Sequence, residues 1–237
     1  MILRGFCIHF AFFIATFLAV NVRADIVDFV MDSSQSYVDL TIVGADAPST
    51  QRSQTTGFGK IDLSPTTEPF GQAQITELNQ TLVDGLGYSV GGGLATLSTT
   101  GGNVMTNLVT PGAAGTVSAG QFDQLANMME LLGNVDVTDP SNIIGGTQTL
   151  DLSTIVLDPI DFTDVTISRT GNTLTISGDY LINATIDTGT MGVPIVLAGS
   201  FLATGAIAIP EPGGLVFLMV AFNTVLLKRK RDNALPA

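Results

Sequence analysis

The chain has 237 residues, of which 13% are charged, and its formal net charge at pH 7 is −12. Its single Cys and single His are Cys7 and His9, and it contains no Trp. Residues 25–209 therefore exclude a disulfide framework, a thiol nucleophile, a Ser-His-Asp triad and a zinc site with His or Cys ligands.

The charge balance excludes a further class of partner. Residues 25–209 hold nineteen acids, the 21 of the chain without Glu211 and Asp232, and three cations, so their net charge is −16; the cations are Arg52, Lys60 and Arg169. Nucleic-acid binding depends on Lys and Arg that neutralise phosphates, so we exclude nucleic acid as a partner. Anionic lipid or polysaccharide would also be repelled unless divalent cations bridged the charges. We interpret the acidity as a solubility surface.

The first 24 residues have the order of a secretory signal peptide. Arg4 supplies positive charge, an apolar run extends from Phe10 to Val20, and Val22-Arg23-Ala24 precedes Asp25. The apolar run has eleven residues, whereas a membrane-spanning helix needs about 20, which argues against the alternative of a retained anchor. The sequence therefore predicts export and cleavage between Ala24 and Asp25.

Short runs with a period of two predict β-strands near the start of the body. The run SYVDLTIVG at residues 36–44 alternates polar and aliphatic side chains, and GFGKIDLS at 57–64 places Lys60 and Asp62 between apolar neighbours. The opening segment DFVMDSSQSYVDLTIVG resembles the start of YceI-like lipid-binding barrels. That resemblance implies a barrel that encloses an apolar ligand.

One amphipathic helix is predicted, over residues 118–134. Its apolar side chains recur at i, i+3, i+4 and i+7 and would form one face: Phe122, Leu125, Ala126 and Met129. Ser118 and Gln121 match a capping box, and Gly133-Asn134 would end the helix. The apolar spacing of residues 75–87 also fits a helix, although their Thr and Gln content argues against one.

Three acids recur at intervals of three around Pro159: Asp158, Asp161 and Asp164. Ca²⁺ takes six to eight oxygen ligands, and a turn with several carboxylates can supply some of them. The spacing does not match the twelve-residue EF-hand loop, which needs alternate ligands and a closing Glu. Two interpretations stay open, calcium ligands or acids that cap and turn the chain, and we favour the second. We predict no cofactor.

The clearest pair of strands is predicted at residues 164–187. Two period-two runs flank Gly171-Asn172, which is typical of a tight hairpin because Gly takes positive φ without steric cost. Residues 147–158 and 193–209 also have strand patterns. Strands about 8–15 residues apart with Gly-rich turns predict one all-β domain, an antiparallel sandwich or barrel, that carries the one short helix.

Residues 210–231 have a three-part order. Pro210, Glu211 and Pro212 come first, followed by an apolar run over residues 213–227 that Asn223 interrupts. Four cations then keep the end of the run on the cytoplasmic side: Lys228, Arg229, Lys230 and Arg231. This order resembles the PEP-CTERM sorting signal of Gram-negative-type bacteria. Residues 232–237 follow it as a short tail.

The resemblance implies a route for the protein. In that family an exosortase, a membrane-embedded cysteine protease, recognises the Pro-Glu-Pro motif and removes the tail. We therefore expect export through the Sec translocon, transient insertion in the inner membrane, and delivery of residues 25–209 to the cell surface or the extracellular matrix. Extracellular polysaccharide is a candidate partner there.

No catalytic residue is predicted. Paired carboxylates can hydrolyse glycosides without His, but nineteen acids form pairs by chance, and aromatic platforms for sugar are scarce, with three Tyr and no Trp. We expect a non-catalytic surface or matrix protein. The alternative is a secreted or membrane-tethered barrel that binds a lipid or another apolar ligand. A large internal cavity would favour the alternative, and a filled core would favour the first hypothesis.

Overall fold

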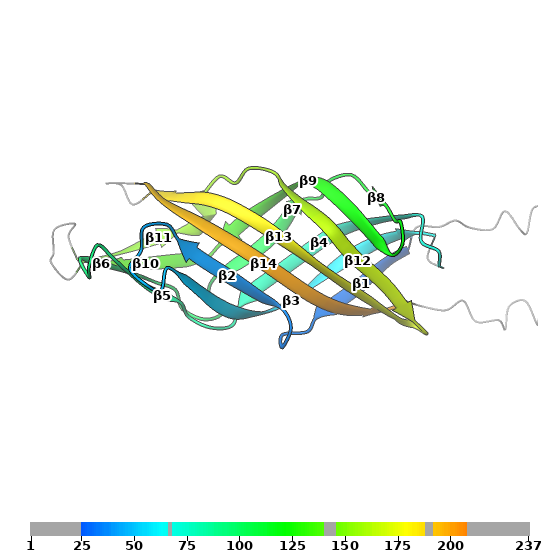
Figure 1. Cartoon of the computed structure of the whole chain (residues 1–237), viewed down its shortest axis with the longest axis horizontal. Helices are drawn as coiled ribbons and strands as arrows, with labels where there is room; N and C mark the ends of the chain where they lie inside the picture. The colour runs from blue at the N-terminus through cyan, green and yellow to red at the C-terminus, as the bar shows by residue number, and fades with distance from the viewer. Residues whose placement is uncertain (1–24, 66–67, 140–145, 188–191, 208–237) are drawn as a thin grey trace, which may run out of the picture. The chain divides into compact units, whose positions relative to one another are not determined.

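The computed structural model describes residues 25–65, 68–139, 146–187 and 192–207, which belong to one compact unit (Figure 1). The predicted all-β class is confirmed for these residues, since their only helical element is one turn of 3-10 helix. The predicted signal peptide, sorting motif, basic cluster and tail lie outside the described residues.

The strands and the helical turn follow one another in this order: β1 Asp25–Met31, β2 Tyr37–Ile42, β3 Thr50–Ser64, β4 Gln72–Leu82, β5 Gly87–Val90, β6 Ala95–Ser98, β7 Met105–Thr110, β8 Gly115–Thr116, β9 Gln121–Leu132, β10 Asn134–Thr138, β11 Thr147–Asp151, η1 Leu152–Thr154, β12 Ile160–Thr170, β13 Thr173–Asp187 and β14 Gly192–Ala206.

Ten strands form one antiparallel sheet that closes on itself. Its order is β1-β3-β2-β14-β13-β12-β9-β7-β4-β8, and additional pairings join β3 to β4 and β1 to β14. β1 and β2 share one position in the ring, because β2 pairs with the first part of β14 and β1 with its last residues, where Phe29 lies opposite Gly205. Closure pairs the long strands on both sides and removes the exposed edges that favour aggregation. We call this the closed sheet.

Four short strands form a second sheet in the order β11-β10-β6-β5. Figure 1 shows it at the end of the unit opposite the start of β1. It is fastened to the closed sheet beside β2, where the Tyr88 hydroxyl donates to the Leu40 carbonyl at 2.6 Å and the Asp46 N–H donates to the Ser89 carbonyl at 2.8 Å. The two sheets therefore share one continuous set of buried side chains.

The helix predicted over residues 118–134 is wrong, and this segment forms β9. Inward-facing side chains alternate at Phe122 and Gln124, and then again at Asn127 and beyond, because a bulge at Leu125 and Ala126 shifts the alternation by one residue. Ala126 has a φ of +59°. Of the four side chains expected on one helix face, Phe122 and Met129 are buried, whereas Leu125 and Ala126 lie in the bulge and face outward.

The predicted capping box is a turn between two strands. Ser118 and Gln121 each donate their N–H to the other's carbonyl, at 2.8 and 3.0 Å. The same type of irregularity explains residues 75–87: β4 covers most of them, and its register with β3 shifts between Lys60 and Ile61. Ile75 and Leu78 are therefore both buried although they are three residues apart.

The other predicted strands are confirmed. Residues 36–44 and 57–64 contain β2 and the end of β3, and residues 193–209 contain most of β14. β12 and β13 form the predicted hairpin, with Gly171 at a φ of +62° in its turn. Residues 147–158 are strand only as far as Asp151, where η1 begins.

Aromatic rings fill the closed sheet by lying over glycines of neighbouring strands. Phe29 lies opposite Gly59 and Gly205, and Tyr180 lies opposite Gly199. A methyl group built on Gly199 would lie 2.1 Å from the Tyr180 ring, so glycine leaves the room that the ring occupies. Many large side chains of the interior are completely buried, among them Phe29, Phe162, Phe201, Leu131, Leu174 and Ile176.

Candidate functional site

Both ends of the described chain lie at the same end of the closed sheet. β1 starts at Asp25, opposite Leu63, and β14 ends beside β1 and β13. The Ile207 N–H donates to the Asn172 carbonyl at 2.8 Å, and Ile207 is only 4% exposed, so the body is fixed as far as this residue. We call this end, with the β3–β4, β8–β9 and β12–β13 connections, the terminal end.

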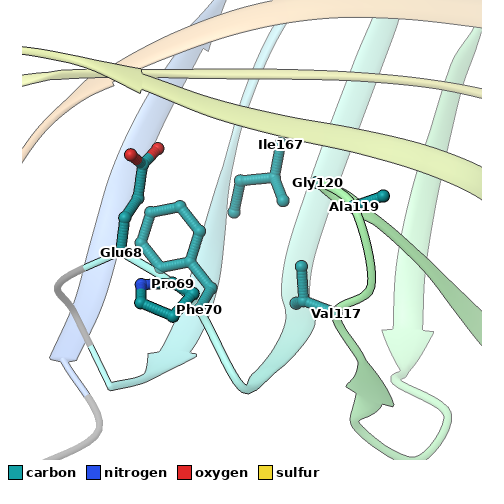
Figure 2. Close-up of a pocket in the computed structure, with 7 residues that line it drawn as sticks. All are labelled: Glu68, Pro69, Phe70, Val117, Ala119, Gly120 and Ile167. Carbon is teal, nitrogen blue, oxygen red and sulfur yellow. The ribbon is translucent and has the colours of Figure 1, made fainter.

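A pocket with a volume of about 410 Å³ lies at the terminal end. Its wall is formed by the β3–β4 connection, the β8–β9 connection and strand β12, which are distant in sequence: Glu68, Pro69, Phe70, Val117, Ala119, Gly120 and Ile167. Figure 2 shows the Phe70 ring beside the Glu68 side chain, with Ile167 and Val117 across from it. The floor is therefore apolar and the rim carries one carboxylate.

Backbone hydrogen bonds hold the pocket together. The Gly71 N–H donates to the Ser64 carbonyl, and the Gly71 carbonyl accepts from the Val117 N–H, both at 3.0 Å. The second bond joins the β3–β4 connection to the residue that follows β8. The Glu68 carboxylate accepts from the Arg169 N–H at 3.1 Å, so this connection is also fastened to β12. Ala119 and Gly120 both have positive φ, as a tight turn between antiparallel strands requires.

The chemistry of this pocket is that of binding. Phe70, Val117 and Ile167 offer apolar contact area, and Glu68 offers one hydrogen-bond acceptor with a negative charge. The seven lining residues contain neither a nucleophile with a neighbouring base nor two carboxylates, which are the minimum for covalent catalysis or for glycoside hydrolysis. Pockets of 300–1,000 Å³ with a few polar groups are typical ligand sites.

The three acids considered as calcium ligands are exposed and do not come together. Asp158 and Asp161 line a shallow hollow of about 280 Å³ with Pro159, Ile160, Leu181 and Asn183. An Asp161 carboxylate oxygen accepts from the Ala126 N–H at 2.8 Å, at the bulge of β9. Asp164 lies at a second bulge, where its N–H donates to Asp123 at 2.8 Å. Within the described residues, no three Asp, Glu, His or Cys side chains are placed to hold a metal ion.

The cations of the body have partners on their own surface. Both nitrogens of the Arg52 fork donate to Asp39 at 2.7 Å, and the guanidinium lies 3.6 Å from the centre of the Tyr37 ring. The hydrogen bonds from Arg52 lower the pKa of the Asp39 carboxyl. The Lys60 ammonium lies 2.5 Å from Glu77, which raises the pKa of Lys60.

Several further acids serve local turns. Hydrogen bonds from Ser34 lower the pKa of Asp32, and those from Ser153 lower the pKa of Asp151. Hydrogen bonds that an Asp carboxylate accepts from the residue two positions later are typical of turns and helix starts. The structure thus gives these carboxylates conformational roles.

A buried polar network crosses the closed sheet. The Tyr180 hydroxyl donates to the Gln80 side-chain carbonyl and lies 3.3 Å from the Thr106 hydroxyl, and the Gln80 amide donates to Thr55 at 3.3 Å. Burial raises the pKa of Tyr180 to about 12. At neutral pH this phenol is therefore uncharged, and the network is a satisfied part of the core.

No family model, curated protein or solved structure matches this chain. The resemblance of its C-terminal segment to a sorting signal thus remains an expectation from the sequence. Pro210, Glu211 and Pro212, the four cations that follow the apolar run, and Ala24 lie outside the described residues; Asp25 is the first residue of β1. Within the described part of the chain, no helix has the length and apolar character to cross a membrane.

Sequence reasoning did not find the pocket. Its residues come from two connections and from strand β12, which only the closed sheet brings together, so no local pattern contains them. The one available signal was Phe70, an aromatic residue in a Pro-rich connection, where a polar residue is usual. Phe70 is buried in the structure.

Proposed function

We propose that this chain is an exported, non-catalytic surface or matrix protein that is sorted, and cleaved by an exosortase, at Pro210-Glu211-Pro212. The observation that carries the proposal is the three-part order of residues 210–231, which begins four residues after the end of β14. An acidic body without Cys suits an extracellular location, where solubility depends on charge.

The architecture of the body supports the same conclusion. The closed sheet is best described as a barrel, and β1 and β14, which follow and precede the two predicted export signals, pair with each other. The described residues between Asp25 and Ile207 thus form one hydrogen-bonded unit, and this unit can be delivered once the flanking segments are removed. The aromatic rings and the Tyr180 network that occupy its interior favour a structural protein over a barrel that encloses a large lipid.

The test is the intact mass and location of the protein in its native host, compared with the Glu211→Ala variant. We expect the wild type to lack its first 24 residues and the residues after about Pro212, and to be found at the surface or in the medium. The variant should keep the basic cluster and stay in the membrane. Asp232→Ala, which removes a carboxylate from the tail outside the motif, should be processed as the wild type is.

The proposal fails if the wild type and the Glu211→Ala variant both keep Lys228 to Arg231 and remain in the membrane. The C-terminal segment would then be an ordinary anchor. Cleavage of both proteins at the same rate would also contradict it, because the motif would not be the recognised feature.

The pocket at the terminal end favours a second candidate function, the binding of a small apolar molecule. Phe70, Val117 and Ile167 could cover an aliphatic chain, and Glu68 would select a ligand that carries a donor or a positive charge. Hexylamine and hexanoate are suitable probes, titrated into the purified body with backbone amide chemical shifts as the readout. Saturable shifts at Val117 and Ile167 with the amine alone would support this function, and no shift with either would rule it out.

A further inference from the structure

The predicted cleavage motif is very close to the folded body. Ile207 is buried and hydrogen-bonded to Asn172, and two residues, Ala208 and Ile209, separate it from Pro210. A chain spans at most about 3.3–3.6 Å per residue, so Pro210 lies within about 10 Å of Ile207. The start of the apolar run at Gly213 lies within about 20 Å of it by the same measure.

The last strand cannot be released without opening the closed sheet. β14 pairs with β13 along its whole length, from Gly192 opposite Asp187 to Ala206 opposite Thr173, and it also pairs with β2 and β1. Drawing Ile207 away to expose more chain would break bonds at both edges of the strand. The folded body, rather than an extended chain, is therefore what reaches a processing enzyme.

We propose that the terminal end is a docking surface for the membrane-embedded protease that processes the chain, and that the 410 Å³ pocket receives a basic side chain of that protease. The inference rests on the proposed function. A protease whose active site lies at the membrane must come within about 10 Å of the terminal end to reach the motif, so contact with the folded body follows from the length of the linking chain.

The pocket has the chemistry for such a side chain. Lys and Arg cover apolar surface with their stems and keep the charge at the rim. Phe70 and Val117 would contact the stem, and Glu68 would accept from the charged head group. The surrounding body has a net charge of −16, which attracts a basic partner and accelerates the encounter.

The pocket and the motif are also within reach of one partner. Ile167 lies opposite Ile176, which lies opposite Ala203, so the pocket is two strands away from β14, about 10 Å. Ala203 precedes Ile207 by four residues, about 13 Å along the strand. A single protein domain is therefore large enough to contact the pocket and the motif at the same time.

The test measures the rate of C-terminal processing of the full chain in its native host by pulse-chase. An insertion of ten Gly and Ser residues between Ala208 and Ile209 would allow the motif to move away from the protease while the body is docked on it. The effective concentration of the motif at the protease active site would fall, and we expect processing to slow about tenfold. Val117→Arg would fill the pocket with a cation, and we expect a reduction of about fivefold. The control is Val156→Arg, the same change at a residue that is 91% exposed, between η1 and β12.

A disulfide variant distinguishes docking of the folded body from a mechanism in which β14 must first unfold. Thr173 and Ala206 lie opposite each other next to the hydrogen-bonded pair of Asn172 and Ile207, so they form a non-hydrogen-bonded pair whose geometry suits a disulfide. The Thr173→Cys/Ala206→Cys variant, once oxidised, should be processed at the wild-type rate. This variant also tests the inference if Val117→Arg does not fold.

The outcomes are distinguishable. If Glu211→Ala is processed normally, the proposed function itself fails. If Glu211→Ala blocks processing while the insertion and Val117→Arg leave the rate unchanged or increase it, only the docking surface is wrong. An increase with Val117→Arg would indicate that the chain's own tail occupies the pocket. Slow processing of the oxidised disulfide variant would show that β14 must open, which overturns the inference.

Discussion

The side chain of Gln124 pairs with the backbone of Ile75 as a neighbouring strand would. The Ile75 N–H donates to the Gln124 carbonyl oxygen at 2.6 Å, and the Gln124 amide donates to the Ile75 carbonyl at 2.9 Å. On β4, the pairs with β7 end at Asn79 and those with β8 begin at Ala73. Gln124 therefore fills the gap that β7 and β8 leave between β4 and β9.

Replacement of Gln124 should destabilise the fold strongly. Gln124→Leu keeps the volume but leaves the N–H and carbonyl of Ile75 buried without partners, and we expect a loss of about 3 kcal/mol in the free energy of unfolding. Urea denaturation measures this loss. Gln121→Leu, at an exposed position of the same strand, should change the free energy by less than about 0.5 kcal/mol. Equal effects of the two changes would contradict the strand-like role of Gln124.

Regular alternation makes much of the fold predictable. β2, β13 and the part of β12 from Val165 onward follow an unbroken period of two, and Gly171 marks the turn between β12 and β13. β9 is not predictable in this way, because its bulge at Leu125 and Ala126 breaks the period of two. The bulge is held by Asp161, an acid of another strand, and such a long-range partner has no signature in the sequence of β9.

The candidate site is predictable only in part. The three-part order of residues 210–231 is local, so a single sequence can contain it. The pocket depends on how Phe70, Val117 and Ile167 converge at the terminal end, and this follows from sheet closure. The acids Asp158, Asp161 and Asp164 show the opposite error. They are near in sequence and Asp158 and Asp161 line one hollow, but Asp164 lies at a separate bulge of β12, so the three do not form one site.

Glycine at position 199 should be required by the ring of Tyr180. A methyl group there would lie 2.1 Å from the ring, and its three nearest atoms would all belong to Tyr180. Overpacking of this type costs about 1–3 kcal/mol. We expect Gly199→Ala to lower the urea midpoint accordingly. Gly87→Ala, where a methyl group would meet nothing within 4 Å, is the matched control. In a Tyr180→Leu background the cost of Gly199→Ala should shrink, and an unchanged cost would exclude the ring as its cause.

The Arg52–Asp39 pair should stabilise the fold above the usual pKa of aspartate. Because the folded state lowers the pKa of Asp39 below its usual value of 3.8, this contribution is present above pH 3.8 and is lost as the pH falls through the lowered value. Arg52→Met keeps a stem over Tyr37 and removes the charge. The difference in unfolding free energy between wild type and variant should be constant near neutral pH and vanish in acid. It should also decrease with added salt, since the pair is partly exposed. If the difference in unfolding free energy persists in acid, the stabilisation comes from packing of the Arg52 side chain on Tyr37 and not from the ion pair with Asp39.

Alkaline pH should destabilise the protein through two buried tyrosines. Burial raises the pKa of Tyr88 and of Tyr180 to about 12, from a usual value of 10.0. The unfolded chain releases these protons first, so stability is fully present below pH 10.0 and falls as the pH rises towards 12, by about 1.4 kcal/mol per pH unit for each group. Urea unfolding at a series of pH values measures the slope.

The Tyr180→Phe variant measures how much of the loss of stability at alkaline pH comes from Tyr180. It loses the hydrogen bond to Gln80 and should be less stable than the wild type at pH 8, but the fall in its stability above pH 10 should be shallower, since one titrating group is gone. Tyr88→Phe, which loses the bond to Leu40, should behave in the same way. If both variants keep the wild-type slope, the alkaline loss has another origin, such as repulsion among the nineteen acids as Lys60 loses its charge and leaves Glu77 unpaired.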